Sequence, residues 1–311
     1  LIKTSFSKSD ENYSETFKNF QDNRLIIAQR LAALNGDSSG TVDEFGYPIG
    51  YGKNNQAVLI PAFLSAYSGK NAENISLNAI TDNPLPNWSI NYSGLINIDF
   101  FKERFKKFSL GHAYRSSYTL NNFKSNLEYN PSNTQLTDDS GNYINEFLYT
   151  NINLVEQFNP LLKIDMELNN SLQIVMSLKK DRALSLSLDN NLLTESNGTD
   201  YSIGLGYRIK DLKFTNRVGG KRRVSKGDLN IKTDLNFRDN ITIIRNLNIE
   251  DNKVTAGQKM WSLKTSADYN LSKSFNAIFF YDHLFSKFAI STAFPMTTIR
   301  AGMTLRYNFG E

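Results

Sequence analysis

Hydrophobic and polar residues alternate with period two over most of the chain. The pattern is clearest in residues 297–309, where Ile299 and Met303 stand among apolar odd positions and the even positions are polar or glycine. The same alternation recurs in four further segments: 162–168, 201–209, 229–237 and 261–271. Because successive side chains of a β-strand point to opposite faces of a sheet, the pattern predicts strands with one apolar and one polar face.

About twelve antiparallel strands are predicted, in up-and-down order. Their approximate bounds are 1–10, 87–95, 106–128, 144–168, 171–189, 200–209, 212–217, 228–237, 240–248, 258–271, 275–285 and 296–309. Short turns are expected near Asn169 to Asn170, Asp211, Asp239 and Lys273, and long polar loops near 129–143, 190–199, 218–227, 249–257 and 286–295. Outer-membrane barrels alternate short periplasmic turns with longer extracellular loops, so the order favours an all-β, transmembrane antiparallel β-barrel.

A membrane barrel divides the two faces of each strand between lipid and lumen. Since Lys or Arg facing lipid near the midplane costs roughly 2–4 kcal/mol, the charged residues opposite the apolar faces are predicted to face a wet lumen. These residues are Lys163, Asp165, Glu167, Lys232, Asp234, Lys264, Asp268, Arg300 and Arg306. The residues predicted to face lipid are Ile164, Met166, Leu205, Tyr207, Leu235, Trp261, Leu263, Tyr269, Ile299, Met303, Leu305, Tyr307 and Phe309.

Residues 12–86 break the strand pattern. Apolar side chains at three- and four-residue spacing predict an amphipathic helix over residues 14–34, stopped by Gly36. A second helix is expected over residues 54–67, with Gly69 as its terminator. This segment is expected to cover or enter the mouth of the barrel. The predicted organisation is a barrel strand at 1–11, a helical insertion on the extracellular or luminal side at 12–86, and barrel strands at 87–311.

Composition and motifs exclude several functions. The 311 residues contain no cysteine, which excludes disulfides, thiolate metal sites and cysteine nucleophiles. The net charge of +4 is spread along the chain without a basic block, so nucleic acid is not an implied partner. The longest apolar run, residues 57–64, is far shorter than the roughly 20 residues of a membrane-spanning helix. Without a nucleophile elbow, phosphate loop or metal-ligand cluster, we predict no enzyme activity, catalytic residue, metal or cofactor.

A few features allow a chemical and a structural interpretation. Asp165 and Glu167 could share a proton or a cation, but with Lys163 beside them a hydrated lumen face is favoured. Gly204 and Gly206 are expected to relieve crowding between neighbouring strands. One basic cluster is predicted to be a solvated loop, with contact to anionic lipopolysaccharide heads as the alternative. It comprises Lys221, Arg222, Arg223 and Lys226.

Several long stretches resemble one known family. They are AISTAFPMTTIRAGMTLRYNF at 289–309, LPNWSINYSGL at 85–95, LGHAYRSSY at 110–118, GYPIGYGKNNQAVLIPAFLSAYSGK at 46–70, SETFKNFQDNRLIIAQRLA at 14–32 and RALSLSLDNNLLTE at 182–195. Together they resemble the C-terminal part of the SprA/Sov family, the outer-membrane translocons of the type nine secretion system of Bacteroidota.

The resemblance implies one very large single-chain barrel that exports folded cargo proteins. It implies a PorV-like small barrel, a periplasmic plug protein and secreted cargo as partners, beside the outer-membrane lipid and lipopolysaccharide of a Gram-negative bacterium. The strands would be the last third of the wall, and the start at Leu1 is expected for a piece of a longer chain. Two alternatives stay open. One is a standalone porin-like or enzymatic barrel of about twelve strands, and the other is a soluble or surface-exposed β-rich binding domain.

Overall fold

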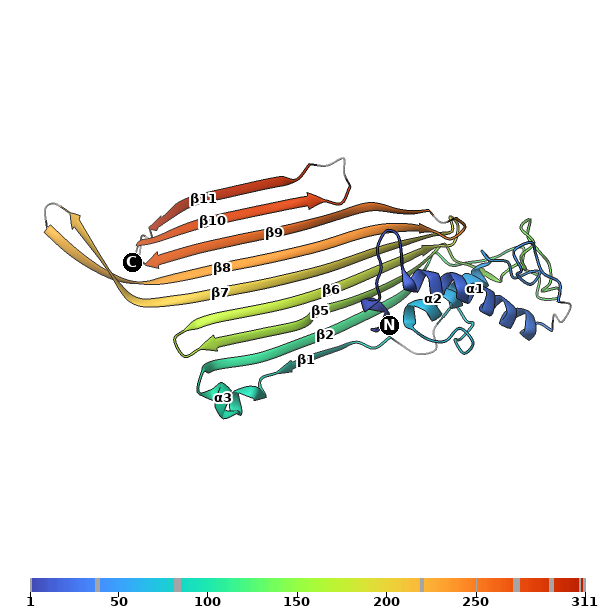
Figure 1. Ribbon diagram of the computed structural model, residues 1–311, viewed down its shortest axis with the longest axis horizontal. Helices are drawn as coiled ribbons and strands as arrows, with labels where there is room; N and C mark the ends of the chain where they lie inside the picture. Colours follow the sequence, from blue (N-terminus) through green and yellow to red (C-terminus); the bar gives the residue numbers. More distant parts are fainter. Residues whose placement is uncertain are drawn as a thin grey trace.

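One large antiparallel sheet dominates the computed structural model (Figure 1). The structure describes residues 2–36, 40–80, 85–218, 221–249, 251–270, 275–290, 294–307 and 309. The sheet has nine strands, each paired with its neighbour in the order β1-β2-β5-β6-β7-β8-β9-β10-β11. Their bounds are Trp88–Tyr92 (β1), Phe105–Asn121 (β2), Asn151–Leu168 (β5), Leu172–Ser187 (β6), Leu192–Val218 (β7), Lys221–Asn246 (β8), Asn252–Asn270 (β9), Phe275–Phe288 (β10) and Met296–Tyr307 (β11). The predicted all-β, up-and-down order is confirmed.

The remaining elements are short or belong to the insertion. They are a 3-10 helix at Thr4–Phe6 (η1), helices at Glu15–Leu34 (α1) and Gln56–Ser68 (α2), a 3-10 helix at Gly94–Asn97 (η2), a one-turn helix at Asp99–Lys102 (α3), and the small pair Lys124–Ser125 (β3) and Phe147–Leu148 (β4).

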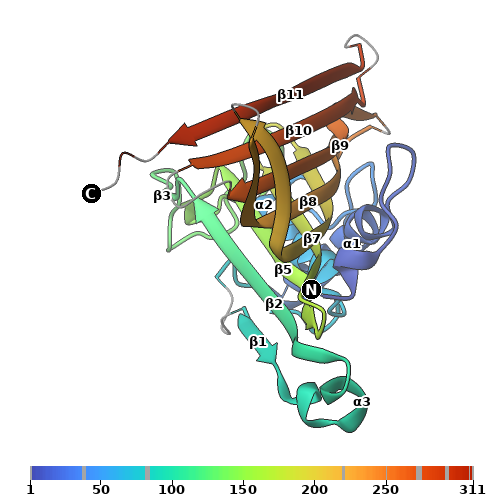
Figure 2. The same ribbon diagram turned by 90° about the vertical axis from the view of Figure 1, so that its left-hand side faces the viewer.

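The sheet is open. Among the described residues β1 pairs only with β2, and β11 pairs only with β10. Figure 2 shows these two strands at opposite ends of the sheet. A closed barrel is therefore not formed by these residues, and the structure establishes the coarser class, a mostly antiparallel β protein.

The two ends of the strands differ in their connections. At one end, called the turn end, residues 169–171 join β5 to β6, and the last residue of β7, Val218, pairs with the first residue of β8, Lys221. At the other, called the insertion end, residues 122–150 join β2 to β5, and α1 and α2 lie beside the sheet (Figure 1). The predicted turn at Asn169 to Asn170 is confirmed. The predicted turn at Lys273 lies outside the described residues.

Two predicted turns are wrong. Asp211 lies inside β7, where its positive φ of 52° and a shift of pairing between Ile209 and Leu212 mark a bulge. Asp239 lies inside β8, and its carboxylate is 3.1 Å from the ammonium of Lys259 on β9. The predicted strands 200–209 and 212–217 are therefore one strand, as are 228–237 and 240–248.

Three predicted loops are also corrected. Residues 192–199 belong to β7, 221–227 to β8 and 252–257 to β9. The basic cluster that begins at Lys221 thus stands on a strand at the turn end, at the opposite end of the sheet from α1 and α2.

The predicted strand at residues 1–11 is not formed in the described residues 2–11. Residues Thr4–Phe6 form a 3-10 helix, and Ser9 makes an isolated bridge with Ser14. This segment packs against the sheet instead of joining it, because Arg182 of β6 donates hydrogen bonds to Thr4, as described below.

Both predicted helices are confirmed. The Ser14 hydroxyl caps α1 by accepting from the backbone N–H of Phe17, 3.3 Å away, and Gly36 follows the end of the helix with φ 71°. Gly69 ends α2 at φ 70°, a left-handed conformation that suits glycine. The rings of Phe20 and Phe63 meet edge to face at 5.9 Å and join the two helices.

The insertion packs against one face of the sheet near the insertion end. Phe20, Phe63 and Tyr67 form one buried core with side chains of β5, β6 and β7. The sheet contributes Ile152, Leu154, Leu184, Leu186 and Leu193. The insertion therefore covers part of a sheet face, and the rest of that face stays uncovered by described residues.

Candidate functional surfaces

One face of the sheet is apolar across all nine strands. Directly paired residues share a face, so the register defines transverse rows. A central row contains Tyr92, Leu110, Ile164, Met176, Ile203, Leu235, Leu263, His283 and Ile299. Eight of these nine side chains are apolar or aromatic. We call this side of the sheet the apolar face.

The opposite side is polar. The adjacent row contains Asn91, Gly111, Lys163, Ser177, Ser202, Asn236, Ser262, Leu284 and Thr298. A second row on this polar face alternates in charge over four strands through Asp234, Lys264, Asp282 and Arg300. The Arg300 guanidinium lies 2.8 Å from the Asp282 carboxylate. Opposite charges on adjacent strands stabilise such pairing, by about 0.2–1 kcal/mol each.

The register sorts the predicted site residues without exception within the strands. All nine residues predicted to face a lumen lie on the polar face, and the predicted lipid-facing residues of the strands lie on the apolar face. Phe309 follows β11, 93% exposed, with its ring 4.8 Å from that of Tyr307. Which face meets lipid or water is not part of this geometry and stays a prediction.

Aromatic rows border the apolar face. Tyr201, Phe237, Trp261 and Phe285 form one row toward the insertion end, with ring centroids of Tyr201 and Phe237 6.2 Å apart. Tyr207, Tyr269 and Tyr307 lie toward the turn end. On β9 the border residues Trp261 and Tyr269 are eight residues apart, or about 26 Å along the strand at about 3.3 Å per residue. Because barrel strands are tilted by about 35–45°, this length corresponds to a height of about 18–21 Å, somewhat less than the apolar band of about 25 Å on outer-membrane barrels.

Glycines on the polar face lie under side chains of the neighbouring strand. A Cβ on Gly204 would lie 3.0 Å from a carboxylate oxygen of Asp234, and one on Gly302 would lie 2.7 Å from the Phe280 ring. The interpretation of Gly204 as a position that relieves crowding therefore fits its surroundings.

Two buried ion pairs lie on the apolar face beneath the insertion. The Arg182 Nε of β6 donates to the Glu156 carboxylate of β5 at 2.9 Å, and the Tyr114 hydroxyl donates to the same carboxylate at 2.8 Å. Arg182 also donates to the backbone oxygen and the hydroxyl of Thr4, both at 2.9 Å. With side chains only 3% and 1% exposed, Arg182 and Glu156 tie η1 to the sheet.

The second pair repeats this arrangement on the next two strands. The Arg245 Nε of β8 donates to the Glu195 carboxylate of β7 at 3.0 Å, and Arg245 also donates to the Ser9 hydroxyl and the Asp10 backbone oxygen. The neighbouring Tyr67 of α2 is fully buried, and this burial raises the pKa of its phenol above the ordinary range. The phenol therefore stays neutral beside the two pairs.

These ion pairs are not among the features predicted from the sequence. Their signal is a charge at a position where the alternation calls for an apolar residue. Glu156 follows Ile152 and Leu154 in phase on β5, and Arg182 precedes Leu184 in phase on β6. Such a charge on an apolar face indicates that something other than lipid covers it.

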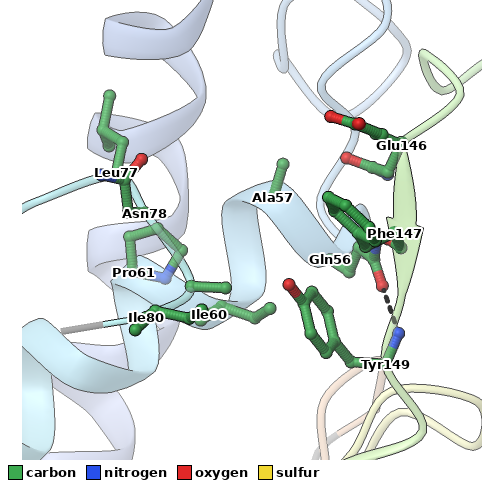
Figure 3. Close-up of a pocket in the computed structure, with 12 residues that line it drawn as sticks. Gln56, Ala57, Ile60, Pro61, Leu77, Asn78, Ile80, Glu146, Phe147 and Tyr149 are labelled. Carbon is green, nitrogen blue, oxygen red and sulfur yellow. Dashed lines mark hydrogen bonds between the residues drawn. The ribbon is translucent and has the colours of Figure 1, made fainter. Parts of the chain in front are cut away.

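A groove of about 500 Å³ lies between α2 and β4 (Figure 3). Ile60, Pro61 and Phe147 give it apolar walls, and Glu146 lies at its rim. The Gln56 amide closes one side, since its oxygen accepts from the backbone N–H of Tyr149 at 3.1 Å and its nitrogen donates to the Phe147 carbonyl. The groove thus lies where α2 of the insertion contacts the long connection between β2 and β5, and the two hydrogen bonds of Gln56 hold these segments together.

The described ranges hold neither a metal-binding cluster nor a membrane-spanning helix. They contain no group of three or more His, Cys, Asp or Glu side chains placed to hold a metal ion. The helices described there include none with the length and hydropathy required to cross a membrane.

Comparisons with known proteins do not place the chain. No known protein family matches it, and no curated protein is found to be similar to it.

Proposed function

We propose that this chain forms part of the wall of a protein-conducting outer-membrane channel, the translocon of type nine secretion. The observation that carries the proposal is the division of one nine-stranded meander into an apolar and a polar face. The resemblance of six long stretches to the SprA/Sov family supplies the particular channel.

The apolar face needs a cover outside the described chain. Ile203 is 40% exposed, Leu235 44% and Ile299 58%, although all three stand in the central apolar row. A contiguous apolar surface of this extent is not stable against water. Its aromatic borders are those expected of the lipid-facing band of an outer-membrane barrel, so membrane lipid is the proposed cover.

The polar face suits a water-filled channel. Its charges alternate in sign and form exposed pairs, such as Lys107 with Asp165 at 2.7 Å. Function in this proposal is geometric: the polar face lines a wet passage for folded cargo, and no bond is made or broken. A PorV-like small barrel, a periplasmic plug protein and secreted cargo are the proposed partners.

The outer edges of β1 and β11, which pair with no strand among the described residues, support a wall that continues into further strands. Unpaired edges promote uncontrolled association, and a barrel removes them by pairing every strand on both sides. In the proposed orientation the turn end faces the periplasm and the insertion end faces outward, because the longer connections lie there. The insertion shares a face with the proposed lipid-facing residues, which favours a place outside the wall, above the outer leaflet.

The denatured mass of the native polypeptide tests this proposal. These residues account for 35.3 kDa, and blotting or mass spectrometry on purified outer membranes gives the mass of the polypeptide that carries them. We expect a mass several times larger, as one giant wall requires. A mass near 35.3 kDa plus a signal peptide would contradict the translocon and favour a standalone barrel, whose function would be argued from its conductance.

A further inference from the structure

A small polar cavity lies between η1 and the sheet, away from the polar face. Its volume is about 120 Å³, which is enough for several waters or one tetrahedral oxyanion. Its lining is rich in hydroxyl groups from both the N-terminal segment and the strands. The lining residues are Thr4, Ser5, Ser7, Ser9, Thr16, Lys180, Arg182, Glu195, Asn197 and Thr199.

The fixed charges around this cavity leave one ammonium uncompensated. Glu195 is neutralised by Arg245, and Arg182 by Glu156. Lys180 of β6 forms no ion pair within the described residues, and its ammonium lies 4.4 Å from the centre of the Phe6 ring. The cavity therefore carries a net charge of about +1, with a buried guanidinium on the same side.

A buried hydroxyl in the lining also has no partner. Ser5 is only 5% exposed, and its Oγ makes no hydrogen bond in the described structure. Leaving a buried polar group unsatisfied costs about 1–3 kcal/mol, so such a group indicates a missing acceptor or donor. Hydroxyls donating beside an ammonium and a guanidinium are the chemistry that binds phosphate oxygens.

The cavity has a defined height on the sheet. Lys180 pairs with Thr199 on the apolar face. The next row of that face, in the direction of the turn end, pairs Leu178 with Tyr201, which belongs to the aromatic row toward the insertion end. In the proposed orientation this is the level at which outer-leaflet headgroups lie, because aromatic girdles mark the interface.

We propose that this cavity binds a phosphate group, with Lys180 supplying the charge and Ser5 and Thr199 donating hydrogen bonds. Phosphate groups occur both on the lipid A headgroup and as free inorganic phosphate. The lipid source rests on the proposed membrane placement, whereas binding of inorganic phosphate needs only the folded insertion. If the membrane placement is wrong, the cavity still binds inorganic phosphate, so failure of the proposed function and failure of the phosphate site give different results.

The test uses the full-length native protein in detergent, with inorganic phosphate as the first probe in calorimetric titration. We expect binding that weakens at least tenfold in Lys180→Gln. The matched control is Lys287→Gln, on the same transverse row and face but outside the cavity, and it is expected to change the affinity less than twofold. Thr199→Val, which removes one lining hydroxyl and keeps both cations, is expected to weaken binding as well and serves where Lys180→Gln does not fold.

Lipid A with and without its phosphates, in mixed micelles, distinguishes the sources. If lipid A with its phosphates competes with inorganic phosphate and lipid A without them does not, the ligand is the lipid headgroup. If neither lipid competes, the ligand is free phosphate. The site would be overturned if the wild type does not bind inorganic phosphate. It would also be overturned if Lys180→Gln and Thr199→Val both bind inorganic phosphate as tightly as the wild type.

Discussion

Replacing Glu195 with alanine is expected to weaken the attachment of the insertion to the sheet by about 3–5 kcal/mol. The variant leaves the Arg245 guanidinium, whose side chain is 0% exposed, buried without its carboxylate. Arg245 holds the Ser9 hydroxyl and the Asp10 backbone, so the segment around η1 is expected to open. Hydrogen exchange of the backbone amides of residues 4–14 in the native protein would rise a hundredfold or more.

Two further variants make this test specific. Asp282→Ala breaks the exposed pair with Arg300 on the polar face and is expected to cost no more than about 1 kcal/mol. The double change Glu195→Leu with Arg245→Met removes both charges and is expected to recover the stability of the sheet, whereas exchange in residues 4–14 stays raised because the hydrogen bonds of Arg245 to Ser9 and Asp10 are lost as well. If Glu195→Ala leaves exchange in residues 4–14 unchanged, the buried pairs do not hold the insertion.

Arginine in place of Leu235 is expected to destabilise the membrane-embedded protein by about 1–3 kcal/mol, between the cost at the bilayer midplane and the cost at the interface. Leu235 stands on the apolar face between the aromatic borders, two residues from Phe237 of the row toward the insertion end. The matched control is Asn236→Arg, one residue further on β8 and on the polar face, for which little change is expected. Urea unfolding in lipid, together with the amount of folded protein in outer membranes, measures both variants.

The same pair of variants separates lipid from water as the environment of the apolar face. Leu235 is 44% exposed in the described chain, so in a water-soluble protein an arginine there would be tolerated as well as at Asn236. Equal stability of the two variants would therefore argue for a β-rich binding domain and against a membrane wall.

Alternation along the chain predicts the two faces well. The side-chain period of a strand is two, so once the register is fixed the apolar side chains of adjacent strands lie on the same face of the sheet. It predicts the strand ends poorly. Around Asp211 and Asp239 the residues are polar in both phases, which resembles a turn. In the structure these positions lie within long strands that extend beyond the apolar band at both ends of the sheet, where both faces can be polar. Polarity there does not separate strand from loop.

The helices and the ion pairs show a similar contrast. Ser14, Gly36 and Gly69 predict the helix ends because capping is local chemistry. The pairing of Glu156 with Arg182, 26 residues away, depends on the β5–β6 register and on where η1 packs, which local patterns do not contain. The same holds for the position of the insertion on the apolar face.

Single-cysteine labelling tests the central claim, that the apolar face meets lipid and the polar face meets water. The 311 residues contain no cysteine, so Leu235→Cys and Asn236→Cys each introduce a single reporter into this chain. In intact outer membranes we expect a water-soluble maleimide to label position 236 and to leave position 235 unlabelled until the protein is denatured. Equal labelling of the two positions in the native membrane would contradict the account.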